Sequence, residues 1–96
     1  MANGSWIEVT SEADGFTFPV WRETARGRRK GGLVLIQEIF GVTRDIKRLA
    51  ADFSAAGYEV LAPALFERQS PRFIASHRTK EGIAKARAAA EASSWD

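Results

Sequence analysis

The stretch Gly32-Leu33-Val34-Leu35-Ile36-Gln37-Glu38-Ile39-Phe40-Gly41 decides the fold of this 96-residue chain. Its four consecutive large aliphatic residues, 33–36, predict a strand that is buried on both faces. The strand ends at the polar pair Gln37-Glu38, and a helical pattern begins after Gly41. Because ligands of open α/β sheets bind outside the carboxyl ends of the strands, Glu38 is a candidate functional carboxylate. On spacing alone, a strand-end glutamate that faces water is the commoner alternative.

The bulk composition is that of one small soluble domain. Hydrophobic residues make up 45% of the chain and charged residues 27%, and the net charge of +2 does not predict a nucleic-acid-binding surface. The chain has no cysteine and one histidine, which excludes disulfides and leaves no recognisable metal-ligand spacing. No apolar run approaches membrane length, and the first residues lack signal-peptide features. We expect a cytoplasmic chain that binds no metal, cofactor, nucleic acid or membrane.

Two alternating segments on either side of Asp14-Gly15 predict a β-hairpin. Residues 6–10 alternate weakly and residues 16–21 alternate more clearly, while Asp-Gly is a strong turn signal. Pro19 cannot donate a hydrogen bond to a neighbouring strand. We therefore expect the second strand of the hairpin to lie at a sheet edge or to contain a bulge.

A helix and a second buried strand follow the deciding stretch. Thr43 is a plausible N-cap, and Gly57 suits the left-handed position after the helix ends. Between them, apolar residues recur at helical spacing: Ile46, Leu49, Ala50, Phe53 and Ala56. Residues 58–62 then predict a strand that ends at Pro63. The strand–helix–strand order predicts a βαβ unit with parallel strands and a right-handed crossover, and so an α/β fold.

The remaining segments are less informative. Residues 67–80 are polar and irregular, which predicts a surface loop, and residues 81–92 predict an alanine-rich helix whose sizeable apolar anchor is Ile83. The basic, glycine-rich segment 26–32 is typical of a solvated turn before a strand. An anion or nucleic-acid site there is the alternative, without an aromatic platform to support it.

Several common catalytic and binding motifs are missing. The turn after residue 36 has one glycine, which excludes the dinucleotide and phosphate-loop motifs, and the chain has no Gly-x-Ser-x-Gly. The one histidine, His77, follows Ser76 and could be drawn into a constellation with Glu38. Adjacent residues rarely point into one site, and a loop histidine is usually solvated, so the sequence gives this arrangement little support.

Together, the segments 33–42, 46–49, 56–58 and 61–66 resemble the dienelactone hydrolase (carboxymethylenebutenolidase) family of α/β-hydrolases. The most specific part is Gln-Glu-Ile-Phe-Gly followed by Pro-x-Leu-Phe, and residues 81–87 and 95–96 are also similar. The resemblance implies that residues 1–96 form an incomplete, N-terminal portion of such a domain. The implied architecture is a partial α/β-hydrolase fold: a hairpin plus a βαβ unit of a mainly parallel sheet, with flanking helices.

The resemblance also implies roles for two residues. Glu38 matches the family's active-site glutamate, which contacts the cysteine nucleophile and helps to activate its thiol. Ile39 matches the residue whose backbone N–H supplies one donor of the oxyanion hole. The implied substrate is a small-molecule lactone or ester, hydrolysed through an acyl-cysteine intermediate without a cofactor.

The chain departs from the family pattern in ways that leave its enzymatic status open. The family's cysteine, aspartate and catalytic histidine lie in a part of the fold after residue 96, so we expect the chain alone to be inactive and do not equate His77 with that histidine. The loop 70–77 has no clear match. No substrate-binding arginine is assigned, although Arg72 and Arg78 are nearest by position.

A sheet without its later strands would expose an edge. In the family's arrangement residues 33–36 pair with strands on both sides, and here one of those strands is missing. The resulting apolar edge would favour instability or self-association. The alternative function is therefore a non-catalytic interaction module that pairs through this edge, and a basic domain built on residues 26–30 is a third, weaker possibility.

Overall fold

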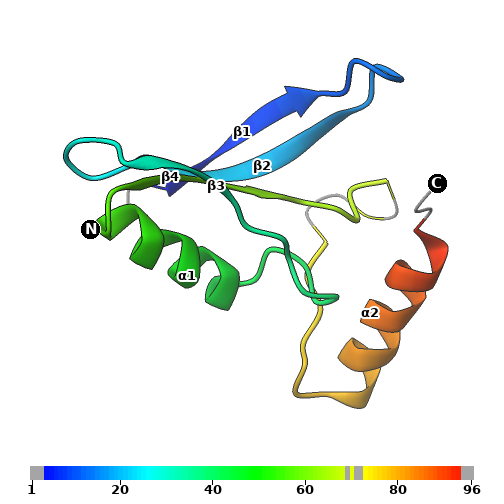
Figure 1. The fold of residues 1–96 in the computed structure, drawn as a ribbon. Helices are drawn as coiled ribbons and strands as arrows, with labels where there is room; N and C mark the ends of the chain where they lie inside the picture. The colour runs from blue at the N-terminus through cyan, green and yellow to red at the C-terminus, as the bar shows by residue number, and fades with distance from the viewer. Residues whose placement is uncertain (1–3, 69, 71–72, 94–96) are drawn as a thin grey trace.

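The computed structural model describes residues 4–68, 70 and 73–93. Its elements, in chain order, are β1 (Gly4–Thr10), β2 (Thr17–Glu23), β3 (Gly31–Val34), α1 (Arg44–Ala55), β4 (Tyr58–Pro63) and α2 (Lys80–Ala92). The four strands form one sheet in the order β1-β2-β4-β3 (Figure 1). β2 is antiparallel to β1 and β4, whereas β3 runs parallel to β4. The mixed sheet with flanking helices confirms the predicted partial α/β fold.

The predicted hairpin is present. β1 and β2 pair from Thr10 opposite Thr17 to the far ends of both strands. In the turn, the Asp14 carboxylate accepts a hydrogen bond from the Phe16 N–H at 3.1 Å, and Gly15 has φ +74°. This conformation explains why Asp-Gly is such a reliable signal at this position.

The expectation that Pro19 would place β2 at a sheet edge or in a bulge is wrong, because both ladders of β2 keep an unbroken register. β2 lies inside the sheet, between β1 and β4. The Pro19 carbonyl accepts a hydrogen bond from the Ala64 N–H at 3.1 Å, so its nitrogen also faces the β4 side. The β2–β4 ladder ends at Val20 opposite Pro63. Because the Pro19 nitrogen faces the β4 side just beyond this ladder, its missing N–H breaks no hydrogen bond of the β1–β2 pairing, in which Pro19 lies opposite Glu8.

α1 has the predicted ends. The Thr43 hydroxyl accepts a hydrogen bond from the Ile46 N–H, and Gly57 after the helix has φ +105°. Its predicted buried face is partly wrong, because Leu49 and Phe53 are 41% and 38% exposed. The buried residues are instead Ile46, Ala50 and Ser54. α1 packs along one side of the sheet (Figure 1), and these three residues form the narrow stripe that it buries.

β3 lies at the edge of the described sheet, as the sequence analysis predicted. The prediction that it is buried on both faces is wrong. Leu33 and Leu35 are half-buried on the side of α1, and the Leu35 N–H continues the pairing to the Leu61 carbonyl at 2.8 Å. On the opposite face, Val34 and Ile36 are 64% and 59% exposed. Within the described residues, no helix covers that face, which explains the difference from the prediction.

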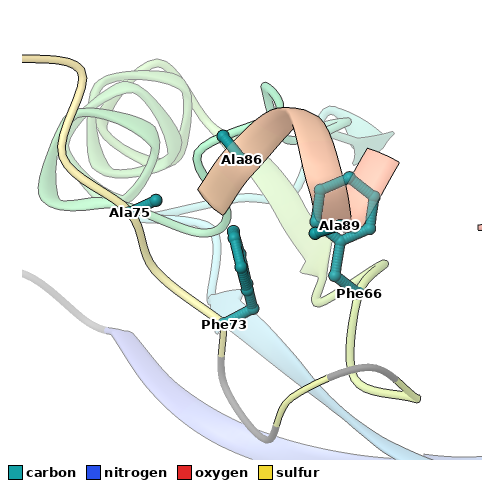
Figure 2. Close-up of a cluster of buried hydrophobic side chains, with 5 residues drawn as sticks. All are labelled: Phe66, Phe73, Ala75, Ala86 and Ala89. Atoms are coloured by element: carbon teal, nitrogen blue, oxygen red, sulfur yellow. The ribbon is translucent and has the colours of Figure 1, made fainter. Parts of the chain in front are cut away.

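A second hydrophobic cluster was missed by the sequence reasoning. Five residues from the segment before α2 and from α2 itself pack together in Figure 2: Phe66, Phe73, Ala75, Ala86 and Ala89. The Phe66 and Phe73 rings meet edge to face, with centroids 5.3 Å apart. The predicted surface loop therefore contains core residues, and small alanines rather than Ile83 anchor α2.

No helix of the described ranges is long and apolar enough to span a bilayer.

Candidate active-site turn

Residues 37–41 form a tight turn at the carboxyl end of β3. The Gly41 N–H donates a hydrogen bond to the Glu38 carbonyl at 3.1 Å. Gly41 has φ +96°, and a Cβ placed on it would lie 1.9 Å from the Phe73 carbonyl oxygen. Only glycine satisfies both the backbone conformation and this close approach.

The segment that leads to α2 holds the other side of the turn. Gly41 and Ile74 form an isolated β-bridge, and the Ala75 N–H donates to the Phe40 carbonyl at 2.9 Å. The His77 ring meets the Phe40 ring edge on, with centroids 5.7 Å apart. The turn is therefore fixed from two directions, by β3 and by residues 73–77.

Gln37 fixes the turn from inside. Its side chain is buried, with 9% of the residue exposed. The Nε2 group donates to the Glu38 carbonyl at 3.1 Å, and Oε1 accepts from the Leu65 N–H at 2.9 Å. Sequence reasoning treated Gln37 only as a strand end. The available signal was an amide directly after an aliphatic strand, since a buried amide needs hydrogen-bond partners.

The two predicted site residues lie next to each other on this turn and face outward. Glu38 is exposed, and Ile39 is 39% exposed. Of the residues that the structure describes, none accepts a hydrogen bond from the Ile39 N–H. A carboxylate and an available backbone donor thus share the carboxyl end of a sheet strand, which is where α/β proteins place their ligands.

Among the described residues, no hydrogen bond joins the side chains of Ser76, His77 and Glu38, which the sequence analysis considered as a catalytic group. The Ser76 hydroxyl accepts from the Arg78 N–H at 3.1 Å, and His77 is exposed beside Phe40. Arg78 is exposed too, whereas Arg72 lies outside the described residues. The described ranges contain no group of three histidine or carboxylate side chains placed to hold a metal ion.

One cavity of the described residues lies away from this turn. It has a volume of about 220 Å³ between the hairpin and the segment after β4, and Phe16, Phe18 and Arg68 contribute to its walls. The Arg68 guanidinium lies 4.0 Å from the Phe16 ring centroid and pairs with Asp14. The Phe16 N–H and then Arg68 hold the pKa of the Asp14 carboxyl below its usual value. Neither predicted site residue lines this cavity.

The basic segment is at the other end of β3. Residues 26–30 are exposed and precede the strand, whereas the turn follows it. The Arg26 and Lys30 N–H groups donate to the Ser54 and Gly57 carbonyls at 3.1 and 2.8 Å. These bonds tie the segment to the C-terminal end of α1, as expected for an ordered turn that leads into a strand.

Comparison with known proteins identifies a family model and several relatives that the chain matches. The model of the dienelactone hydrolase family matches residues 19–94. A candidate carboxymethylenebutenolidase from Azospirillum brasilense is 36% identical over 75 residues, which cover 78% of this chain and 32% of the relative. One from Synechocystis is 41% identical over 51 residues, which cover 53% and 20%.

Solved structures agree with the sequence matches. A candidate dienelactone hydrolase from Klebsiella pneumoniae is similar with a TM-score of 0.53 and 29% identity, over 72% of this chain and 30% of that one. The structure of m3DLH, at 20% identity, shares the fold with a TM-score of 0.63 over 93% of this chain and 35% of its own. The chain thus spans about a third or less of the length of these relatives. From the family match and the shared fold, the chain belongs to the dienelactone hydrolase family.

Proposed function

We propose that this chain supplies the N-terminal part of a dienelactone hydrolase-like site, in which Glu38 and the Ile39 N–H act on a small-molecule ester or lactone. The cysteine nucleophile would come from a separate segment, since the 96 residues contain none. The observation that carries the proposal is the turn 37–41, which presents a carboxylate and a backbone donor side by side at the end of β3.

The two groups suit the chemistry of acyl transfer to a thiol. An exposed carboxylate beside an incoming thiol accepts its proton and so raises the fraction of nucleophilic thiolate. The tetrahedral intermediate carries negative charge on the former carbonyl oxygen, and a fixed backbone N–H stabilises that charge. Glu38 would serve the first step, and the Ile39 N–H the second.

Reconstitution tests this proposal. The full chain is mixed with a second polypeptide that carries the family's cysteine, aspartate and histidine, and hydrolysis of p-nitrophenyl acetate and dihydrocoumarin is followed. We expect no hydrolysis by the chain alone and activity in the mixture that iodoacetamide abolishes. Glu38→Ala is expected to lower the rate by about 100-fold, the lower range for a general base.

Glu12→Ala is the matched control, because Glu12 is an exposed glutamate in the hairpin turn. It should leave the rate unchanged. A mixture that hydrolyses neither substrate, or one in which Glu38→Ala and Glu12→Ala behave alike, would contradict the proposal.

The edge of β3 supports a second candidate function, an interaction module. Among the described residues β3 has one neighbour in the sheet, and this edge strand exposes the side chains of Val34 and, just beyond it, Ile36 on one face. Unpaired strand edges with apolar side chains recruit further strands. We propose that two copies of the chain pair through their β3 edges.

Sedimentation of edge variants tests this pairing. Val34→Lys places a charge on the free edge and is expected to shift the chain from dimer to monomer. Val9→Lys makes the same change on β1, at the opposite edge of the sheet, where Val9 is 36% exposed. Equal sedimentation of the parent chain and Val34→Lys, or monomer formation by both variants, would contradict pairing through β3.

A further inference from the structure

The orientation of the peptide bond between Glu38 and Ile39 is fixed by hydrogen bonds to its carbonyl. This carbonyl accepts from the Gln37 Nε2 group and from the Gly41 N–H, each at 3.1 Å. In a trans peptide, the C=O and the following N–H lie in one plane and point in opposite directions. Holding the Glu38 carbonyl therefore aims the Ile39 N–H away from the turn.

We propose that Gln37 is the positioning residue of the Ile39 N–H donor. This inference rests on the proposed function, because the donor has a catalytic meaning only if it binds an oxyanion. Gln37 touches neither substrate nor the reacting thiol in this role. It acts through the Glu38 carbonyl and keeps the peptide from rotating into an orientation that would bury the N–H.

Both ends of the Gln37 carboxamide are needed for this task. Its Oε1 accepts from the Leu65 N–H at 2.9 Å, which anchors the side chain to the segment after β4. With the oxygen engaged there, the Nε2 group is directed at the Glu38 carbonyl. A carboxylate at position 37 could keep the bond from Leu65 but could not donate to the carbonyl, whereas a protonated carboxyl could do both.

The burial of Gln37 favours lasting hydrogen bonds to the Glu38 carbonyl and the Leu65 N–H. The residue is 9% exposed, so water competes weakly for its hydrogen bonds. Glu38 and Ile39 on either side of the peptide are exposed, so neither side chain holds the plane by packing. The two hydrogen bonds to the Glu38 carbonyl are therefore the interactions that act directly on this peptide plane.

Two variants of Gln37 separate positioning from general stability. Gln37→Met removes both bonds at similar size, and Gln37→Glu removes the donor while its carboxylate is ionised. Thr43→Val is the control: it removes the N-cap bond to the Ile46 N–H, close to the turn, without touching the Glu38 carbonyl. All three are studied with the 96-residue chain and in the reconstituted mixture.

The first measurement is independent of catalysis. Residual dipolar couplings of the Ile39 amide and the carbonyl ¹³C shift of Glu38 report the orientation of the peptide and the bonds it accepts. We expect both to change in Gln37→Met and to stay at their parent values in Thr43→Val. A folded Gln37→Met chain with unchanged values would overturn the inference, whether or not the mixture is active.

The second measurement is kinetic. Loss of a whole oxyanion donor lowers kcat by about 10²–10³-fold, so a misdirected donor should cost about 10- to 100-fold in kcat with little change in KM. Burial raises the pKa of a carboxyl, so Gln37→Glu should recover activity as the pH falls, relative to the parent. Equal kcat losses in Gln37→Met and Thr43→Val, or a pH profile of Gln37→Glu parallel to the parent's, would overturn the positioning role. If the mixture with the unsubstituted chain hydrolyses neither substrate, the proposed function is refuted but the inference on Gln37 is not. The orientation of the Ile39 amide then decides on the role of Gln37.

Discussion

Replacement of Gly41 by alanine should unfold the chain at much lower denaturant concentration. Gly41 has φ +96°, and its added Cβ would meet the Phe73 carbonyl oxygen at 1.9 Å and the Ile74 Cα at 3.3 Å. The left-handed conformation costs a non-glycine residue about 1–2 kcal/mol. Relief of the contact needs a backbone shift of about 1 Å, which would break the Ala75–Phe40 hydrogen bond that forms the bridge between Gly41 and Ile74, at about 1 kcal/mol.

The expected loss in the free energy of unfolding is therefore about 2–3 kcal/mol. Urea denaturation followed by tryptophan fluorescence, to which the packed pair Trp6 and Trp21 contributes, measures it. All variants are compared at one protein concentration, because association would shift the midpoint. With a slope of about 1–3 kcal/mol per molar urea, the midpoint should fall by about 2 M.

Two other glycines divide this loss into its parts. Gly15 has φ +74° with open space around it, so Gly15→Ala measures the cost of the conformation alone. Gly82 lies in α2, where a Cβ would meet the Ser76 carbonyl oxygen at 2.0 Å, so Gly82→Ala measures the cost of close contact. A midpoint for Gly41→Ala no lower than that for Gly15→Ala would refute the reasoning, because the contact with Phe73 would then carry no energy.

Two further predictions concern charged groups, Glu59 on β4 and Lys47 on α1. The Arg22 guanidinium, 2.6 Å from Glu59, and then the Ala25 N–H hold the pKa of the Glu59 carboxyl below its usual value. A lowered pKa stabilises the fold fully above the unfolded-state value, and this stabilisation is lost as the pH falls through the folded-state value. Urea midpoints between pH 7 and 3 should therefore fall less steeply for Glu59→Gln than for the parent, and parallel curves would contradict the pairing. The Lys47 ammonium lies 4.4 Å from the Trp21 ring centroid and 5.0 Å from that of Trp6, so Lys47→Met should cost about 1 kcal/mol in the same assay. Lys80→Met is its control, because Lys80 is an exposed residue at the start of α2. Equal midpoint shifts in the two variants would argue against a cation–π contribution.

Features set by a few neighbouring residues could be predicted from the sequence. Asp14-Gly15 specifies its own turn, Thr43 caps the helix that it precedes, and Gly57 ends that helix. Each signal acts through the backbone of the next few residues, so no knowledge of the tertiary structure is needed.

Burial could not be predicted in the same way, because it depends on what lies opposite. Leu49 and Phe53 follow the helical pattern of a buried face, yet they are exposed, and the buried stripe of α1 is Ile46, Ala50 and Ser54. Phe73 is buried although its segment has no periodicity, since its partners come from α2. Gln37 was missed for a related reason: its partner Leu65 lies 28 residues away in the chain.

The position of the turn also links it to two separate parts of the core. Leu35, before it, packs on the cluster formed with Ile46 and Ala62, whereas Phe40 packs on the cluster with Phe73 and α2. Local opening occurs in cooperative units, and α2 rests on the loop residues before it rather than on the sheet. Detachment of α2 in a sub-global fluctuation would release Phe40 while the sheet stayed intact. In a hydrogen-exchange experiment, the Gly41 amide should then exchange at the same rate as the amides of α2. The candidate site would be ordered only while α2, the less stable unit of the fold, stays attached.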